Sequence, residues 1–464
     1  MAEPAVRVRG RRTRDRRIAA DVERAHETSS AGTARTRLPD LSELTRLLAE
    51  SGEVRSLVDR YRTVREGRVG QNLRHVTYAQ MPHGAKSFLA AALVIASGER
   101  LVWIARDAEI ADRVAEELAS WLGGPGNVVT LEPRTSLAYE RSELIRDESA
   151  ARVAALALWR SGKPQVLVAS VQALFQHTLA PHAIPSEPVT MRSGQRISQE
   201  RVLRELLELG YEALPEVAGR GEFARRGGIV DVFPAGEPLP VRIEWFGDEI
   251  ESLRAFDPAN QRGVRPVDAI TLLPASEFLM PTGTGESLRQ ALGSAVNRLS
   301  DDLTADLARL EQGQLADAAE IWAGYLAPAT GLDHISDELL VIDEHPDVSA
   351  AADFLWSQAD ERRAELQTAG ALPKSWPTAY PHPRDWKQRL NAARTLVSQA
   401  SDQYSVPSSG VGARVELRPF FSPQNVALPR PVATLLRLAE RSGPLARLAL
   451  RYRFSYLVAA SRAG

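Results

Sequence analysis

The spacing of apolar and polar residues between positions 221 and 262 predicts a β-hairpin with one face in solvent. Residues 229–233 form an apolar run, residues 234–240 contain the prolines and glycine of a turn, and residues 241–246 alternate with a period of two. Two sets of side chains alternate in this last segment: Val241, Ile243 and Trp245 with Arg242, Glu244 and Phe246. The dense charges around the hairpin indicate a surface that docks another protein rather than a catalytic site.

Residues 41–181 follow a different pattern, in which short apolar strands alternate with amphipathic helices. Strand-like runs lie at 101–105, 128–131 and 166–169, and Asp107 is the expected N-cap of the helix after the first run. Strands separated by helices predict a parallel sheet with right-handed crossovers. The predicted fold class is therefore α/β, with parallel-sheet lobes interrupted by an α+β insert.

After residue 264 the pattern becomes largely helical. One helical stripe contains Leu288, Leu292, Val296 and Leu299. The predicted organisation has five parts: a disordered basic arm (1–40), a first α/β lobe (41–181), the α+β insert (182–264), a second, largely helical lobe (265–366), and an irregular segment with an incomplete βα unit (367–464). The strand-like run 454–461 lacks a covering helix, so we expect the natural domain to continue beyond Gly464.

Composition sets limits on function. The 464 residues suggest about three domains, and 57 basic residues nearly balance 59 acidic ones, so no global charge points to nucleic acid. The chain has no cysteine, which excludes disulfides and thiol catalysis. Its longest apolar run, 88–97, is far shorter than the ~20 residues that cross a bilayer. We expect a soluble, cytoplasmic protein whose basic N-terminal arm is a solvated extension rather than a phosphate-binding tail.

Residues 80–87, QMPHGAKS, stand where a phosphate-binding loop would open a helix. In such loops glycines let the backbone approach the phosphates, the lysine pairs with them, and the hydroxyl holds magnesium. Gly84, Lys86 and Ser87 fit this pattern, but Gln80 and Ala85 replace two glycines. An added Cβ crowds the phosphate, so we expect a loop shaped like a nucleotide site with little or no binding.

A second candidate is the apolar run 339–342 followed by Asp343 and Glu344. In an ATPase such carboxylates would coordinate magnesium and activate water. The same pattern needs no metal if the carboxylates cap the next helix. We therefore interpret the pair as a degenerate or structural site, and predict no catalytic or metal-binding residue.

A third candidate is the basic cluster Arg220, Arg225 and Arg226 around Phe223. These residues could form an ordinary solvated strand entry. Alternatively, arginines with an aromatic anchor form the kind of site that concentrates binding energy in protein interfaces. The acidic residues at 244–251 make the face mixed in sign, which favours a protein partner over DNA.

Residues 221–262 resemble the UvrB-interaction module shared by the excision-repair protein UvrB and the transcription-repair coupling factor Mfd. The resemblance extends over roughly residues 41–366, and it includes PRTSLAYERSELIRDESAAR at 133–152, residues 164–181 and LLPASEF at 272–278. It implies that the insert binds UvrA, and that this region of Mfd has lost the ATPase activity that UvrB retains. Full-length Mfd continues with a polymerase-binding domain and a two-lobed translocase, so the resemblance implies no polymerase displacement by this chain alone.

Residue by residue, the resemblance assigns UvrA binding to Arg226, and it matches Glu222 and Phe223 to the family's Gly-Glu-Phe element. Two positions depart from the family pattern. Ala213 follows Glu212 where a basic residue is common, and Ala224 replaces a second arginine. Arg225 or Arg220 are the expected substitutes.

The preferred hypothesis is a non-catalytic adaptor that binds UvrA, needs no cofactor, and works with the remainder of an Mfd-type motor. The alternative is an ATP-dependent DNA translocase or helicase fragment, in which Lys86, Ser87, Asp343 and Glu344 would act on one nucleotide with magnesium. A third hypothesis is a truncated reading frame with no independent role. DNA contact and oligomeric state stay open at this point.

Overall fold

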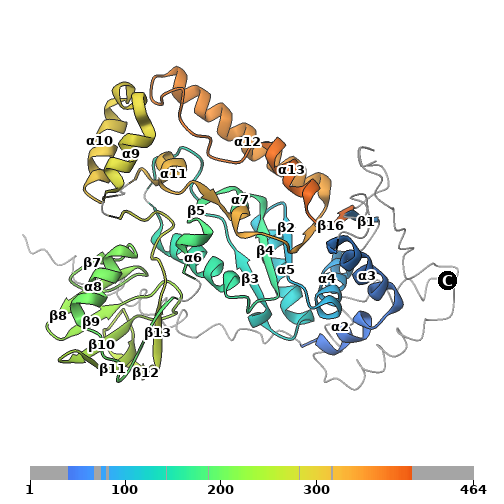
Figure 1. Cartoon of the computed structure of the whole chain (residues 1–464), viewed down its shortest axis with the longest axis horizontal. Helices are drawn as coiled ribbons and strands as arrows, with labels where there is room; N and C mark the ends of the chain where they lie inside the picture. Colours follow the sequence, from blue (N-terminus) through green and yellow to red (C-terminus); the bar gives the residue numbers. More distant parts are fainter. Residues whose placement is uncertain are drawn as a thin grey trace, which may run out of the picture.

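A computed structural model describes residues 40–66, 75–79, 83–142, 144–185, 188–281, 283–314 and 317–399 (Figure 1). The predicted basic arm up to residue 39, Gln80 and the segment from 400 onward lie outside the described residues. The described chain contains a parallel-sheet body, a separate antiparallel module and a helical arm. This mixed arrangement confirms the predicted α/β class, with an α+β insert within it.

A six-stranded sheet forms the centre of the body, and its neighbouring strands are all parallel. In spatial order the strands are β1 (His75–Ala79), β16 (Thr395–Gln399), β15 (Leu339–Ile342), β2 (Leu101–Ala105), β4 (Val166–Ser170) and β3 (Val128–Leu131). The predicted second lobe thus contributes β15 directly beside β2 of the predicted first lobe. All four residues of β15 are buried, and a strand that is apolar on both faces requires helices on both sides of its sheet.

Helices cover both faces of this sheet. One apolar core packs α2 (Ser42–Ala49), α3 (Gly52–Arg65), α4 (His83–Ser97) and α5 (Ala108–Trp121) against alternate strand residues such as Trp103 and Val168. The other core packs the intervening residues, such as Val102 and Leu167, against α6 (Arg146–Arg160), α7 (Val171–Phe175), α12 (His345–Thr368) and α13 (Pro383–Ala392). Asp107 caps α5 as predicted, because its side chain accepts a hydrogen bond from the Ile110 amide at 2.9 Å.

The module is inserted between β4 and β15 and lies at the lower left of Figure 1. Its six-stranded sheet has the order β12 (Gly263–Pro266), β11 (Glu249–Phe256), β10 (Val241–Phe246), β9 (Ile229–Val232), β8 (Glu222–Arg226) and β7 (Glu212–Ala213). All neighbours are antiparallel except β7 and β8. The predicted hairpin is confirmed, with Val241 opposite Val232 and Ile243 opposite Val230.

One face of the module sheet is buried. It packs against α8 (Gln199–Glu208) and against the pair β6 (Val189–Arg192) and β13 (Ala269–Leu272), with Val202, Leu206 and Ile270 in the shared core. Because β13 belongs to this core, the module continues beyond residue 264, where the sequence pattern placed its end.

The helical arm connects the module to β15. It contains α9 (Thr284–Leu292), α10 (Asp301–Glu311) and α11 (Ala319–Leu326), and β14 (Ala329–Thr330) pairs with β5 (His177–Thr178) of the body. The predicted stripe does not lie on one α-helix: α9 ends at Gly293, whose φ of +53° interrupts it, and a 3-10 helix, η4 (Gly293–Arg298), follows. Three shorter 3-10 turns are η2 (Pro125–Asn127), η3 (Pro181–Ala183) and η5 (Gly331–His334). None of the helices that the structure describes is both long and apolar enough to cross a membrane.

Candidate functional site

Strand β8 carries most of the residues predicted to bind a partner. Its outer neighbour β7 pairs only with Glu222 and Phe223, so the second half of β8 extends beyond β7. Successive side chains of a strand point to opposite faces of the sheet. Phe223 and Arg225 therefore face α8, whereas Ala224 and Arg226 face away from it.

Phe223 was predicted to be an apolar anchor for the partner, and the structure corrects this. The side chain is 4% exposed and packs in the module core with Val230 and Val232. Arg225, on the same face, lies with Nη2 3.8 Å from Glu200 Oε1 of α8. Since Ala224 points to the other face, Arg225 is not positioned to replace the arginine expected at that position.

Glu222 and Arg220 make polar contacts within the chain. Glu222 Oε2 accepts hydrogen bonds from the Ala218 and Gly219 amides, both at 2.8 Å, which closes the loop before β8. Arg220 donates from Nε to the Glu237 carbonyl at 3.3 Å, and its Nη1 lies 3.7 Å from Asp147 Oδ1 of α6. The guanidinium of Arg220 thus links the module to the body.

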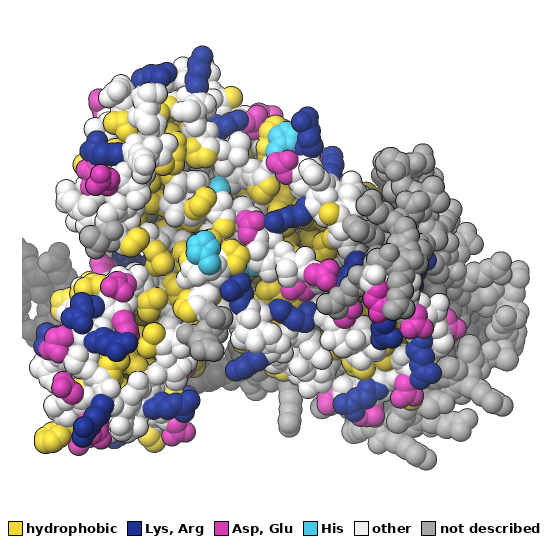
Figure 2. Space-filling view, viewed as in Figure 1, with side chains coloured by type: hydrophobic (Ala, Val, Ile, Leu, Met, Phe, Trp, Pro, Cys, Tyr) yellow, Lys and Arg dark blue, Asp and Glu magenta, His cyan; other side chains and the backbone are white. Residues whose placement is uncertain are grey.

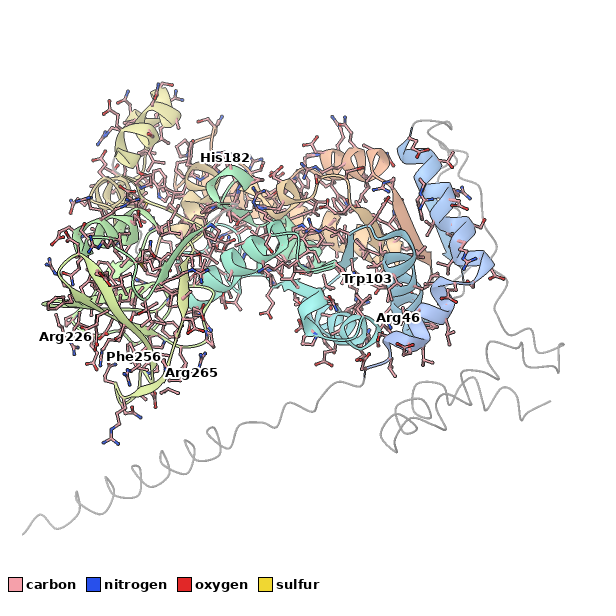
Figure 3. All side chains as sticks on the ribbon, turned by 60° about the horizontal axis from the view of Figure 1, so that its bottom comes forward. Arg46, Trp103, His182, Arg226, Phe256 and Arg265 are labelled. Atoms are coloured by element: carbon pink, nitrogen blue, oxygen red, sulfur yellow. The ribbon has the colours of Figure 1, made fainter. Side chains whose placement is uncertain are left out.

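Arg226 lies on the face of β8 opposite to that of Arg225. It is exposed, its Nη2 donates to the Pro215 carbonyl at 3.1 Å, and Gly227 with φ +62° turns the chain directly after it. Figure 3 shows Arg226 at the outer end of the module, away from the body. Of the five predicted binding residues, Arg225 and Arg226 are exposed, and they lie on opposite faces of the sheet.

The face of the sheet that carries Arg226, called the open face below, is partly covered, because Ala224 packs there with Val217 and Phe256. This face also contains paired charges. Arg242 binds the buried carboxylate of Asp231 through two hydrogen bonds, Nε to Oδ1 at 2.7 Å and Nη2 to Oδ2 at 2.8 Å. These hydrogen bonds to Asp231 raise the pKa of Arg242. Glu244 accepts a hydrogen bond from the Ser252 hydroxyl at 2.8 Å. Figure 2 shows basic and acidic side chains interspersed over the module, so its surface is mixed in sign.

In the body, the structure brings the residues of the predicted nucleotide site together. Lys86, the fourth residue of α4, donates to Asp343 Oδ1 at 3.1 Å and also pairs with Glu344 at the end of β15. Lys86 is 5% exposed and Asp343 is 4% exposed. The ammonium group thus already has two carboxylate partners from its own chain.

The Ser87 hydroxyl contacts side chains of α5. Its hydroxyl donates to Glu117 Oε2 of α5 at 2.6 Å and accepts from the indole Nε1 of Trp121 at 3.2 Å. Gly84 and Ala85 lie in the first turn of α4. This donor set fits a nucleotide poorly, because the lysine pairs with carboxylates and the hydroxyl bonds to a neighbouring helix. No group of three or more His, Asp or Glu side chains suitable for a metal ion occurs in the described part of the chain.

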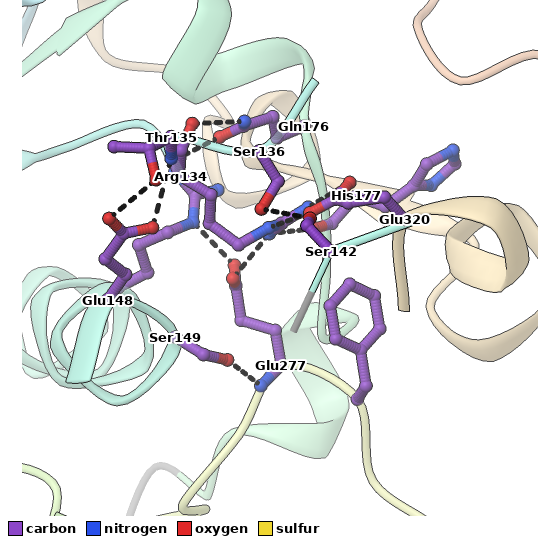
Figure 4. Close-up of polar contacts among 12 residues, drawn as sticks. Arg134, Thr135, Ser136, Ser142, Glu148, Ser149, Gln176, His177, Glu277 and Glu320 are labelled. Atoms are coloured by element: carbon purple, nitrogen blue, oxygen red, sulfur yellow. Dashed lines mark hydrogen bonds and ion pairs between the residues drawn. The ribbon is translucent and has the colours of Figure 1, made fainter. Parts of the chain in front are cut away.

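A buried network of charges joins the module, the body and the helical arm, and the sequence reasoning did not single it out (Figure 4). Glu277 accepts from Arg134 Nη1 at 2.5 Å and from Arg152 Nε at 2.8 Å, and Arg134 Nε also donates to Glu320 of α11 at 2.6 Å. Burial alone would raise the pKa of Glu277, but the charges of Arg134 and Arg152 lower it below its ordinary value. A signal existed, because Arg134 and Arg152 lie in the segment 133–152 and Glu277 lies in 272–278, the two segments that carry the family resemblance.

Backbone groups complete this network. The Glu277 amide donates to the Ser149 hydroxyl of α6 at 2.8 Å, and Arg152 Nη2 donates to the Ala173 carbonyl at 3.1 Å. Nearby, Arg146 of α6 pairs with Glu212 of β7. The N-terminal half of α6 therefore holds the module against the body through both buried and exposed polar contacts.

Comparison with known proteins identifies the module. The UvrB interaction domain family matches residues 189–278. The transcription-repair-coupling factor of Myxococcus xanthus is 30% identical over 352 residues, which cover 72% of this chain and 29% of that protein. The corresponding factor of Escherichia coli K12 is 35% identical over 179 residues, covering 38% of this chain and 15% of its own length.

A UvrABC system protein also matches. Protein B of Gloeobacter violaceus is 29% identical over 251 residues, covering 51% of this chain and 35% of that protein. The chain thus spans less than a third of the length of the coupling factors to which it is similar. Together with the antiparallel module, these matches confirm the predicted resemblance: the chain is homologous to the N-terminal region of the transcription-repair-coupling factors, at about 30% identity, and contains a UvrB interaction domain at residues 189–278.

Proposed function

We propose that this chain is a non-catalytic adaptor of transcription-coupled nucleotide-excision repair that binds UvrA through its UvrB interaction domain. The observation that carries the proposal is the position of Arg226, exposed at the end of β8 on the open face of the module sheet. The proposed site of action is the cytoplasm. The proposed partners are UvrA and the remainder of an Mfd-type motor.

The open face has the features of a protein-binding surface. Arginine offers several planar donors for carboxylates and is among the residues that contribute most to protein interfaces. The Arg242–Asp231 pair keeps the sheet beneath it rigid, so little conformational freedom is lost on binding. Charges of both signs favour recognition of one protein surface over non-specific attraction to DNA phosphates.

The nucleotide loop supports the non-catalytic part of the proposal. For a nucleotide to use Lys86, its ammonium would have to leave both Asp343 and Glu344. Separating a buried ion pair is costly because each charge loses its partner in a medium of low dielectric constant. We therefore infer that this site stabilises the fold by joining α4 to β15.

The proposal is tested by titration calorimetry of the full chain with purified UvrA. We expect the unmodified chain to bind and Arg226→Ala to raise the Kd at least tenfold. Arg265→Ala is the matched control, since Arg265 is also exposed but lies on β12, at the opposite edge of the sheet from β7. Failure of the unmodified chain to bind UvrA would reject the proposal and would implicate the departures at Ala213 and Ala224.

One observation favours the alternative of a translocase fragment. Lys86, Asp343 and Glu344 converge on one place, as that hypothesis requires. Titration with a fluorescent ATP analogue and magnesium separates the two functions. Saturable binding that Lys86→Ala abolishes would favour the translocase fragment, whereas the adaptor proposal expects no saturable binding.

A further inference from the structure

The turn that follows Arg226 consists of two glycines, Gly227 and Gly228, which join β8 to β9. Both glycines are exposed, and Gly227 has a φ of +62°, a conformation that favours glycine. Because glycine has more backbone freedom than any other residue, a Gly-Gly turn does not by itself fix the end of β8. The position of Arg226 therefore depends on the contacts that other elements make with this turn.

Each glycine carbonyl of the turn accepts a hydrogen bond from another element. The Trp245 amide of β10 donates to the Gly228 carbonyl at 2.9 Å. The side chain of Gln199 donates from Nε2 to the Gly227 carbonyl, also at 2.9 Å. The first hydrogen bond joins two backbone groups, so a change of side chain does not remove it. The second depends on the identity of one residue, Gln199.

Gln199 is the first residue of α8 and is only 7% exposed. Its helix has a well-defined start, because the Ser198 side chain caps the first turn. The helix also packs on the module sheet through Val202 and Leu206. A buried amide donor without an acceptor is costly, so we expect the hydrogen bond to Gly227 to be formed in the free chain. Gln199 thus links a buried, fixed helix start to an exposed turn.

We propose that Gln199 is a positioning residue for UvrA binding, which acts through Arg226 and not by contacting UvrA. The inference rests on the proposed adaptor function. Other restraints on the end of β8 are few, since β7 pairs only with Glu222 and Phe223, and the Arg226 guanidinium donates to a single backbone carbonyl. By holding the Gly-Gly turn in one conformation, Gln199 orders Arg226 before the partner arrives, and less conformational entropy is lost on binding.

The test is titration calorimetry of the full chain and its variants with UvrA. Gln199→Met keeps the length of the side chain but removes its donor, and we expect it to raise the Kd about fivefold. Combined with Arg226→Ala, the same substitution should change the Kd less than twofold, because the side chain that it positions is already absent. Gln367→Met is the matched control, since Gln367 of α12 also donates from Nε2 to backbone carbonyls, those of Pro373 and Lys374, both at 3.2 Å.

Amide hydrogen exchange of the free chain tests the cause of this effect. Exchange at residues 226–229 should be faster in Gln199→Met than in the unmodified chain, whereas Gln367→Met should leave it unchanged. Unchanged exchange in Gln199→Met would mean that the side chain does not hold the turn. The comparison with and without Arg226 remains decisive even if Gln199→Met lowers the thermal midpoint, because a general loss of stability would weaken binding in both backgrounds.

The outcomes separate this inference from the function on which it rests. If the unmodified chain binds UvrA and Arg226→Ala weakens binding while Gln199→Met changes the Kd less than twofold, the positioning role is rejected and the adaptor function stands. If Gln199→Met weakens binding equally with and without Arg226, Gln199 does not act through Arg226 and the inference is rejected as well. If the unmodified chain does not bind UvrA, both proposals fail.

Discussion

The parallel-sheet body and the UvrB interaction domain use charged residues in opposite ways. In the body, Arg134, Arg152 and Lys86 are buried, and each pairs with carboxylates of the same chain. In the domain, Arg225 and Arg226 remain exposed at the end of a strand. The difference teaches that the body buries these basic side chains in ion pairs that join elements of the fold, whereas the domain keeps Arg225 and Arg226 at its surface, where they make weaker contacts within the chain.

Removing Glu277, the centre of the buried network, should have the largest effect on the free energy of unfolding. Glu277→Ala would leave the buried guanidinium groups of Arg134 and Arg152 without their shared carboxylate, and such a loss costs about 3–5 kcal/mol. Urea unfolding followed by circular dichroism measures the change. Glu116→Gln, at an exposed position of α5, serves as the control and should change the free energy of unfolding by less than about 0.5 kcal/mol. A loss below about 1 kcal/mol for Glu277→Ala would mean that the network does not hold the fold together.

The ion pairs of Lys86 should contribute less to the free energy of unfolding than the network around Glu277 does. Lys86→Met would remove the cation that pairs with the buried Asp343, at a cost of roughly 2 kcal/mol, because the partly exposed Glu344 can turn to water. Adding Asp343→Asn to Lys86→Met should recover part of the loss, since the buried negative charge is then removed as well. The same urea experiment tests both variants. If Lys86→Met were neutral or stabilising, the structural role assigned to this site would be wrong.

A smaller, pH-dependent effect is expected from buried histidines. Burial lowers the pKa of His334 from its ordinary value of 6.5, and it lowers that of His177 likewise. As the pH falls below about 6.5, the unfolded chain takes up protons that the folded chain does not. Stability should therefore fall toward lower pH, by at most about 1.4 kcal/mol per pH unit for each histidine, until the lowered folded-state pKa is passed.

Thermal unfolding between pH 7.5 and pH 5 measures this dependence. His334→Gln should reduce the slope of stability against pH, whatever its effect on stability at pH 7.5. Substitution of the exposed His182 by Gln is the control for the loss of an imidazole. Equal slopes for the unmodified chain and His334→Gln would contradict the assignment.

Much of the fold could be predicted from local patterns. The runs 101–105 and 166–169 are apolar throughout, and they form the buried parallel strands β2 and β4. The period-two alternation of 241–246 gives β10 of the antiparallel module. These features could be predicted because the apolar or polar character of consecutive residues indicates whether one or both faces of a strand are buried.

The site could be predicted only in part, because its decisive contacts join distant residues. The segment EFARR gives no indication of which face of β8 is buried, since that depends on α8 and β9 packing against it. For the same reason Phe223 was expected on the surface. The network of Arg134 and Glu277 joins residues more than a hundred positions apart, and no local pattern specifies such pairs.

The most direct test of the account compares two neighbouring arginines in one calorimetric titration with UvrA. Arg226→Ala removes an exposed guanidinium from the open face of the sheet, whereas Arg225→Ala removes one from the face that α8 covers. We expect at least a tenfold rise in Kd for Arg226→Ala and less than a twofold change for Arg225→Ala. Equal losses for the two variants, or no binding by the unmodified chain, would contradict the claim that the open face of this domain docks UvrA.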